Sequence, residues 1–185
     1  MHGFIFNEIR KYVVAKLGAP AWDALLDGAG LPGKTFVNYE SYPDEAAVGL
    51  VVTASKVTGL AVDVILEDFG GFLAADLATI YKPLIDPSWK VLDFVEHTEE
   101  TIHHVVRSRN THAHPPRISC NRVGPNEVVI VYSSPRKLCA LAKGIARGAA
   151  QLYGEEVSIR EVTCMHRGNP ECLIVVQKED ASIAS

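Results

Sequence analysis

The first half of the chain carries apolar residues at helical spacing. Ile5, Ile9, Val13 and Leu17 recur every four residues before Gly18, which predicts a helix that ends there. The same kind of spacing predicts further helices that include residues 22–26, 48–55 and 61–81.

Two adjacent glycines stand in the middle of the longest predicted helix. Gly70 and Gly71 cost helix stability, so they need a reason to be there. We expect a close backbone approach or a bend at this point, with tight helix packing and a cofactor lying against the helix as the two possible causes.

The second half changes near Pro115-Pro116 from helical spacing to the pattern of β-strands. One helix is predicted between two pairs of strands, and Gly154 closes it. The predicted strands are residues 118–123, 127–132, 157–163 and 172–177, and the helix is residues 135–153.

This order of elements predicts the α+β class, with an N-terminal helical subdomain packed on a C-terminal four-stranded antiparallel sheet and its helices. We expect a single domain over residues 1–180, with a helical part at about residues 1–65 and an α/β part at about residues 66–180. Residues 181–185 are expected to form a disordered tail.

Composition narrows the range of functions. The 185 residues carry a net charge of −4 and a pI near 6.0, which disfavours nucleic-acid binding. No apolar run approaches the roughly 20 residues that span a bilayer, and no signal-peptide pattern opens the chain, so a cytoplasmic protein is expected. The sequence shows no nucleophile elbow or phosphate loop, so no enzyme activity is expected. Cys120, inside a predicted strand, is expected in the core.

A spaced triplet lies where a predicted strand passes into a predicted helix. Ser134 suits the N-cap of that helix and Pro135 suits its first position. The free N–H groups of the helix would then lie beside the hydroxyls of Tyr132 and Ser134 and the guanidinium of Arg136, which together can hold a carboxylate or phosphate. On this pattern alone, a capped helix with a surface arginine and a carrier of small anions both stay open.

One histidine of an adjacent pair is expected to face the interior. Residues 98–109 predict a helix whose apolar stripe includes Ile102 and Val106. His103 lies at the flank of this stripe, whereas His104 points nearly opposite. His103 can therefore face a pocket, either as a ligand or in a structural hydrogen bond.

Taken together, these features resemble the haem nitric oxide/oxygen binding family, the H-NOX domains. The resemblance rests on a histidine on a helix, a Pro-Pro pair some twelve residues later, a strand, and Tyr-x-Ser-x-Arg at the opening of a helix. Met-x-Gly-x-Ile at the N-terminus and the Phe69-Gly70 step also fit, so the resemblance runs from Met1 to about Gln177.

The resemblance implies a domain that binds haem b at a five-coordinate ferrous iron. In the family, the position of His103 carries the axial ligand of the iron, and the positions of the triplet hold the haem propionates. Ile5 and Pro116 match positions that press on the porphyrin and distort it.

The resemblance also implies which gases bind. Stable oxygen binding requires a hydrogen-bond donor on the distal side of the haem. Oxygen-binding relatives place a tyrosine at the position of Leu141, and the other distal candidates, Ile9 and Leu73, are apolar. We expect nitric oxide and carbon monoxide to bind, without a stable oxygen complex.

Signalling is expected to follow a mechanical switch. The resemblance implies that nitric oxide releases His103 and frees the helix that carries it. Because one domain fills the chain, the output is expected to act in trans. The partner in stand-alone relatives is a histidine kinase or a cyclic-di-GMP synthase or phosphodiesterase.

A cysteine-rich segment near the end of the chain suits a second metal. Cys139, Cys164, Cys172 and His166 offer the donors of tetrahedral zinc, and some relatives look similar here, with three cysteines and one histidine. Glu161 stands where that histidine is expected. Zinc, thiol redox sensing and plain buried cysteines stay open, and a zinc or cysteine redox sensor with a haem-independent output is the alternative function.

Overall fold

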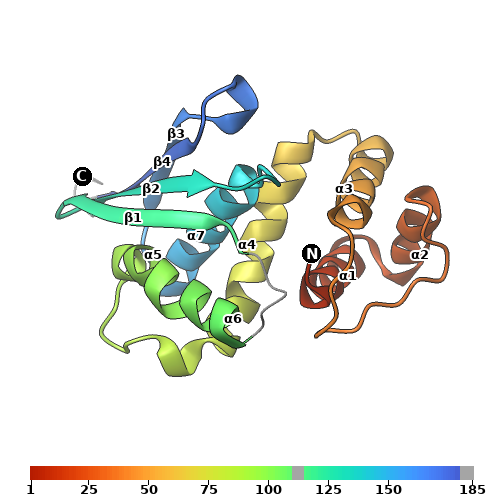
Figure 1. Cartoon of the computed structure of the whole chain (residues 1–185), viewed down its shortest axis with the longest axis horizontal. Coiled ribbons are helices and arrows are strands. Elements are labelled where there is room, and N and C mark those ends of the chain that lie inside the picture. Colours follow the sequence, from red (N-terminus) through yellow and green to blue (C-terminus); the bar gives the residue numbers. More distant parts are fainter. Residues whose placement is uncertain (110–114, 180–185) are drawn as a thin grey trace, which may run out of the picture.

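The computed structural model describes residues 1–109 and 115–179, so the predicted tail at residues 181–185 lies outside it. Within the described parts, helices come first and an antiparallel sheet follows, which confirms the predicted α+β class (Figure 1). The N-terminal helices are α1 (Gly3–Leu17), α2 (Ala19–Gly28), α3 (Asp44–Thr58) and α4 (Val62–Ile80). They are followed by α5 (Val91–Thr98), a π-helical turn (Glu99–His103), α6 (His104–Arg109), β1 (Arg117–Gly124), β2 (Glu127–Ser133), α7 (Cys139–Tyr153), β3 (Val157–Thr163) and β4 (Cys172–Lys178).

The sheet places β2 and β4 in its centre. Its order is β1-β2-β4-β3, with antiparallel pairing throughout. Alternate residues of β2 point inward, so that Val128, Ile130 and Tyr132 are buried on one face, where α5 and α7 cover the sheet. Tyr132 lies opposite Cys172 in the register of β2 and β4.

The helices α4 and α7 run side by side and touch through glycine (Figure 1). A Cβ atom on Gly144 would lie 2.1 Å from the carbonyl oxygen of Glu67, and one on Gly70 would lie 2.5 Å from that of Leu141. These contacts are possible only where no side chain separates the two backbones. The expected close backbone approach at Gly70 is thereby confirmed.

Aromatic rings form the core of the N-terminal helices. Phe6 on α1 stacks on Phe36 with ring centroids 4.2 Å apart, and the edge of Tyr42 meets both rings. Trp22 on α2 closes the cluster against Phe36. This packing fixes the first turn of α1 and therefore the direction in which Ile5 points.

Charged side chains tie α1 to α4. Lys11 donates to Glu8 at 2.7 Å and to Asp76 at 2.8 Å, and Tyr12 donates to Asp68 at 2.7 Å. Glu8 is 1% exposed, and its burial raises the pKa of its carboxyl above the ordinary value. These interactions hold α1 against α4, the helix that packs on α7.

A sharp bend of 111° separates α3 from α4. Gly59 closes α3 in the left-handed region, at φ 72°, and its N–H donates to Ser55. None of the helices in residues 1–109 and 115–179 is by itself long and apolar enough to cross a membrane; α3 and α4 reach that length and composition only as a bent pair.

Candidate functional site

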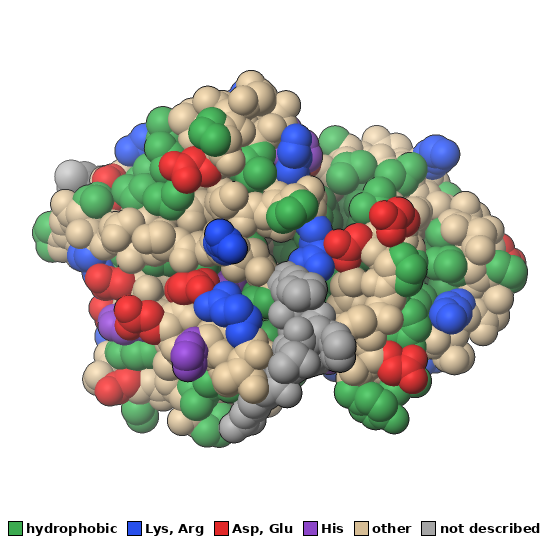
Figure 2. Space-filling model, viewed as in Figure 1, with side chains coloured by type: hydrophobic (Ala, Val, Ile, Leu, Met, Phe, Trp, Pro, Cys, Tyr) green, Lys and Arg blue, Asp and Glu red, His purple; other side chains and the backbone are tan. Residues whose placement is uncertain are grey.

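A large cavity lies between the N-terminal helices and the sheet half of the molecule. Its volume is about 1070 Å³, slightly above the ~300–1,000 Å³ of ordinary small-molecule sites. Its wall is mostly hydrophobic, and Figure 2 shows the molecular surface hollowed between the two halves. The cavity brings together most of the site residues expected from the sequence, which are Ile5, Leu73, His103, Pro116, Tyr132, Ser134, Arg136 and Leu141.

Ile9, which was also expected on the distal side, lies elsewhere. It is buried in the N-terminal core and faces a separate cavity of about 20 Å³ beside Tyr12 and Phe69. The reason is the direction of α1, because its first residues, with Phe4 and Ile5, line the large cavity and the next turn packs in the core. Ile9 is therefore not part of the lining of the large cavity in this structure.

His103 ends the π-helical turn and lines the cavity, whereas His104 is exposed, as expected. The Nδ1 atom of His103 lies 2.9 Å from the carboxylate of Glu99. Because a carboxylate only accepts, Nδ1 carries the shared proton and Nε2 keeps its lone pair for a ligand. Burial lowers the pKa of His103, against an opposite effect of Glu99, which favours the neutral imidazole that a metal requires.

Neither Glu99 nor the π-helical turn was expected from the sequence. The turn is defined by the N–H of His104, which donates to the carbonyl of Glu99 five residues before it. Such turns are rare and often occur at functional sites. The spacing of Glu99 and His103, four residues apart on a predicted helix, was the signal available in the sequence.

The triplet does not start a helix at Pro135, and that prediction is wrong. Residues 134–138 form a turn in which Lys137 is left-handed at φ 51°, and α7 begins at Cys139. Ser134 accepts the N–H of Arg136 at 3.2 Å. The hydroxyl of Tyr132 accepts the N–H of Leu138 at 3.0 Å, so the helix start is anchored from β2.

Arg136 has an ion-pair partner that the sequence did not indicate. Its Nε donates to Asp44 at the start of α3 over 2.7 Å, and the Met1 ammonium lies 2.7 Å from the other oxygen of Asp44. Burial acts to raise the pKa of Asp44, but the two cations outweigh it and hold that pKa below its ordinary value. Asp44 therefore stays a carboxylate at neutral pH and links the N-terminal helices to the triplet.

Cys120 lies at the cavity wall rather than in the deep core. It is half-buried on β1. Burial, with the nearby carboxylates Glu99 and Glu96, raises the pKa of its thiol to about 12. The thiol is therefore protonated and unreactive at neutral pH.

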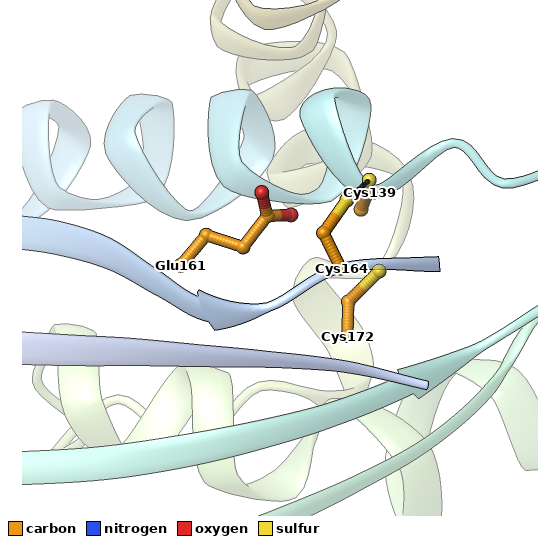
Figure 3. Close-up of side chains that lie close together, drawn as sticks. All are labelled: Cys139, Glu161, Cys164 and Cys172. Carbon is orange, nitrogen blue, oxygen red and sulfur yellow. Dashed lines mark hydrogen bonds between the residues drawn. The ribbon is translucent and has the colours of Figure 1, made fainter. Parts of the chain in front are cut away.

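A second group of donors lies at the start of α7. Cys139 comes from its first residue, Cys164 follows β3, Cys172 opens β4, and Glu161 points toward them from β3 (Figure 3). Their ligand atoms all lie within 4.8 Å of one another, and the sulfur atoms of Cys139 and Cys164 are 3.9 Å apart. Burial raises the pKa of Cys139 and of Cys172.

His166, the expected fourth zinc donor, does not lie in this group. Its Nε2 faces the carbonyl oxygen of Lys137 at 2.8 Å, and the side chain is exposed. Glu161 lies beside the three cysteines instead. Its Oε1 atom is buried and has no hydrogen-bond partner among the described residues. The alternation of β3 puts Glu161 on the same inward face as Val157 and Ile159, which the sequence pattern could have shown.

Comparisons with known proteins agree on one family. The family model for haem-NO-binding domains matches residues 2–161. The crystal structure of an H-NOX protein from S. oneidensis in the Fe(II)NO ligation state superimposes with a TM-score of 0.91 at 28% identity, covering 97% of this chain and 100% of that chain. An NMR structure of an H-NOX domain from Shewanella oneidensis in the Fe(II)CO ligation state gives a TM-score of 0.87 at 28% identity, covering 97% and 99%.

A curated relative is a longer protein. The soluble guanylate cyclase gcy-34 of Caenorhabditis elegans is 28% identical over 183 residues, which are 92% of this chain and 26% of that protein. The chain thus spans about a quarter of the length of this relative.

Proposed function

Because the chain belongs to the haem-NO-binding (H-NOX) family, we propose that it binds haem b in the large cavity and senses nitric oxide and carbon monoxide there. The observation that carries the proposal is the meeting of His103 with Tyr132, Ser134 and Arg136 in one apolar cavity. His103 is about 30 residues before the triplet in the chain, and the fold brings both to the wall of the same cavity. In this role the chain is a sensor without catalytic activity of its own.

The donors of the cavity fit a haem. His103 offers a neutral imidazole nitrogen for the iron, and its hydrogen bond to Glu99 leaves that nitrogen free. The two hydroxyls and the guanidinium of the triplet suit the two propionates. Ile5 and Pro116, which also line the cavity, would press on the ring. A bound ferrous haem would supply an open iron position for a gas.

The cavity also supports the proposed choice of gas. Leu73 and Leu141 give its wall no hydrogen-bond donor at these positions. The hydroxyl of Tyr42, one of the phenols in the lining, accepts the N–H of Val37 at 2.8 Å and donates to Glu40 at 2.9 Å. This hydroxyl is therefore already engaged by the loop that carries it, and oxygen at the leucine positions would lack a hydrogen-bond donor from Leu73 and Leu141.

Absorption spectra of the purified protein test this function directly. We expect about one haem per chain, a shifted Soret band when nitric oxide or carbon monoxide is added to the ferrous protein, and no change in air beyond slow oxidation. A lasting oxygen complex would overturn the choice of gas. A protein that takes up no haem during reconstitution would overturn the whole proposal and favour a carrier of small anions.

Signalling in this proposal starts at His103. The segment that bears it is short, because α5 ends at Thr98 and α6 begins at His104, with the π-helical turn between them. Once His103 no longer holds the cofactor, this segment would be free to move against the sheet. The partner we propose is a histidine kinase or a cyclic-di-GMP synthase or phosphodiesterase acting in trans.

A zinc site is the second function that an observation favours. Two sulfur ligands of a tetrahedral zinc ion lie about 3.8 Å apart when each Zn–S bond is about 2.3 Å long. The 3.9 Å between Cys139 and Cys164 agrees with this spacing. The unpartnered oxygen of Glu161 supplies a fourth donor of suitable charge. Zinc would deprotonate thiols whose pKa burial has raised.

Metal analysis of variants tests the zinc site. We expect about one zinc per chain, at least 10-fold weaker binding in Cys164→Ser, and a smaller loss in Glu161→Gln, because zinc gains most from its thiolate ligands. His166→Ala is the matched control and should keep its zinc, since His166 faces Lys137. The site would be rejected if all variants contained as much zinc as the wild type. It would also be rejected if the wild-type protein held no zinc after incubation with the metal.

A further inference from the structure

We propose that Glu99 is a positioning residue that holds the imidazole of His103 and strengthens it as a metal ligand, while Arg107 limits this effect. The inference rests on the proposed function, because it concerns the bond between His103 and haem iron. Its first support is the hydrogen bond of 2.9 Å between Nδ1 of His103 and the carboxylate of Glu99.

The acceptor is charged, and this decides the strength of the interaction. A metal-bound histidine usually donates its second ring N–H to another group, and a carboxylate in that place raises the basicity of the ligand. A hydrogen bond to a carboxylate is roughly twice as strong as one between neutral groups. Glu99 would therefore give His103 part of the character of an imidazolate.

The surroundings preserve this hydrogen bond. The side chains of His103 and Glu99 are only 18% and 26% exposed, so water competes weakly for either partner. The backbone bond from His104 to the carbonyl of Glu99 closes the π-helical turn around the pair. Ile102, between them in the chain, is buried and anchors the turn in the core.

Arg107 acts in the opposite direction. Its guanidinium pairs with the second carboxylate oxygen of Glu99, so the negative charge is shared between Arg107 and His103. Arg107 is 40% exposed, which leaves Glu99 with part of its charge for the imidazole. Removing Glu99 and removing Arg107 should therefore change the bond between His103 and iron in opposite senses.

The experiment uses the haem-loaded protein and the variants Glu99→Gln and Arg107→Gln. Resonance Raman spectra of the ferrous protein measure the iron–histidine stretch. We expect a lower frequency in Glu99→Gln and a higher one in Arg107→Gln. Redox titration should show a higher Fe(III)/Fe(II) potential in Glu99→Gln, since a less anionic ligand stabilises ferric iron less, and a lower one in Arg107→Gln. Haem transfer to an acceptor protein should be about 10-fold faster in Glu99→Gln.

Glu100→Gln is the matched control, because Glu100 is the exposed neighbour and its replacement removes the same charge. It should leave the stretch unchanged. An unshifted stretch in haem-loaded Glu99→Gln, or an equal shift in Glu100→Gln, would overturn the role of Glu99. If Glu99→Gln does not fold, the test rests on Arg107→Gln. An iron–histidine stretch whose frequency is unchanged or lower in that variant would reject the inference. A wild type that takes up no haem would instead reject the proposed function.

Discussion

Replacing His103 by glycine is expected to abolish the iron–histidine bond and to leave a folded protein. His103 lies at the cavity wall and makes its side-chain hydrogen bond with Glu99 on the same turn, so the core does not depend on it. Haem affinity should fall by more than about 100-fold, because losing only a hydrogen-bond partner of a metal ligand already costs 10–100-fold. Regulation of the partner by nitric oxide should be lost with it.

Imidazole in the buffer provides the decisive measurement. The glycine leaves space beside Glu99, and a free imidazole can occupy it and restore both the iron–nitrogen stretch and haem retention. His104→Gly is the control, since it carries the same cost of about 1 kcal/mol for glycine in a helix but alters an exposed side chain. If His104→Gly loses the stretch and His103→Gly keeps it, the assignment of the ligand is wrong.

Replacing Gly144 by alanine is expected to destabilise the whole chain. The added Cβ would lie 2.1 Å from the carbonyl oxygen of Glu67, which is a backbone atom and cannot turn away. The helices α4 and α7 would have to separate, and the unfolding free energy should fall by about 3 kcal/mol or more. For a chain of this size, that corresponds to a melting temperature lower by about 6–12 °C.

Gly71→Ala is the matched comparison for thermal unfolding. A Cβ there would meet the carbonyl oxygen of Gly144 at 3.9 Å, which is an ordinary contact. Alanine is also the better helix former by about 1 kcal/mol, so this variant should be neutral or slightly more stable. Equal losses in both variants would mean that the contact between the helices tolerates a methyl group.

Local periodicity predicted those site residues whose direction follows from a single element. The helical wheel separated His103 from His104, and the structure places the first, half-buried, at the cavity wall and exposes the second. Alternation along β2 puts Tyr132 on the covered face, a direction that the sequence pattern could have indicated. The resemblance to H-NOX domains then suggested which ligand these residues serve, and the family match supports it.

The failures come from contacts that local propensity does not encode, and some of these join distant segments. Ser134 and Pro135 carried a good local signal for a helix start, but the hydroxyl of Tyr132 and the left-handed Lys137 delay the helix to Cys139. The pairing of Arg136 with Asp44 joins residues 92 positions apart, and no periodicity could have indicated it. The place of Glu161 beside the cysteines could have been predicted from the alternation of β3, although chemical preference pointed to a histidine there.

The order of strands in the sheet has a consequence for synthesis on the ribosome. The chain makes β1 and β2 first as a hairpin, whereas β4, which fills the space between β2 and β3, is the last of the described strands to emerge. Until then, β2 keeps one edge unpaired, with the side chains of Val128 and Ile130 lacking part of their final cover. The N-terminal helices can close their aromatic core well before that moment. The nascent protein is therefore expected to pass through a stage in which the aromatic core of the N-terminal helices is closed and the sheet edge is still open and prone to aggregation, when a chaperone would be of most use.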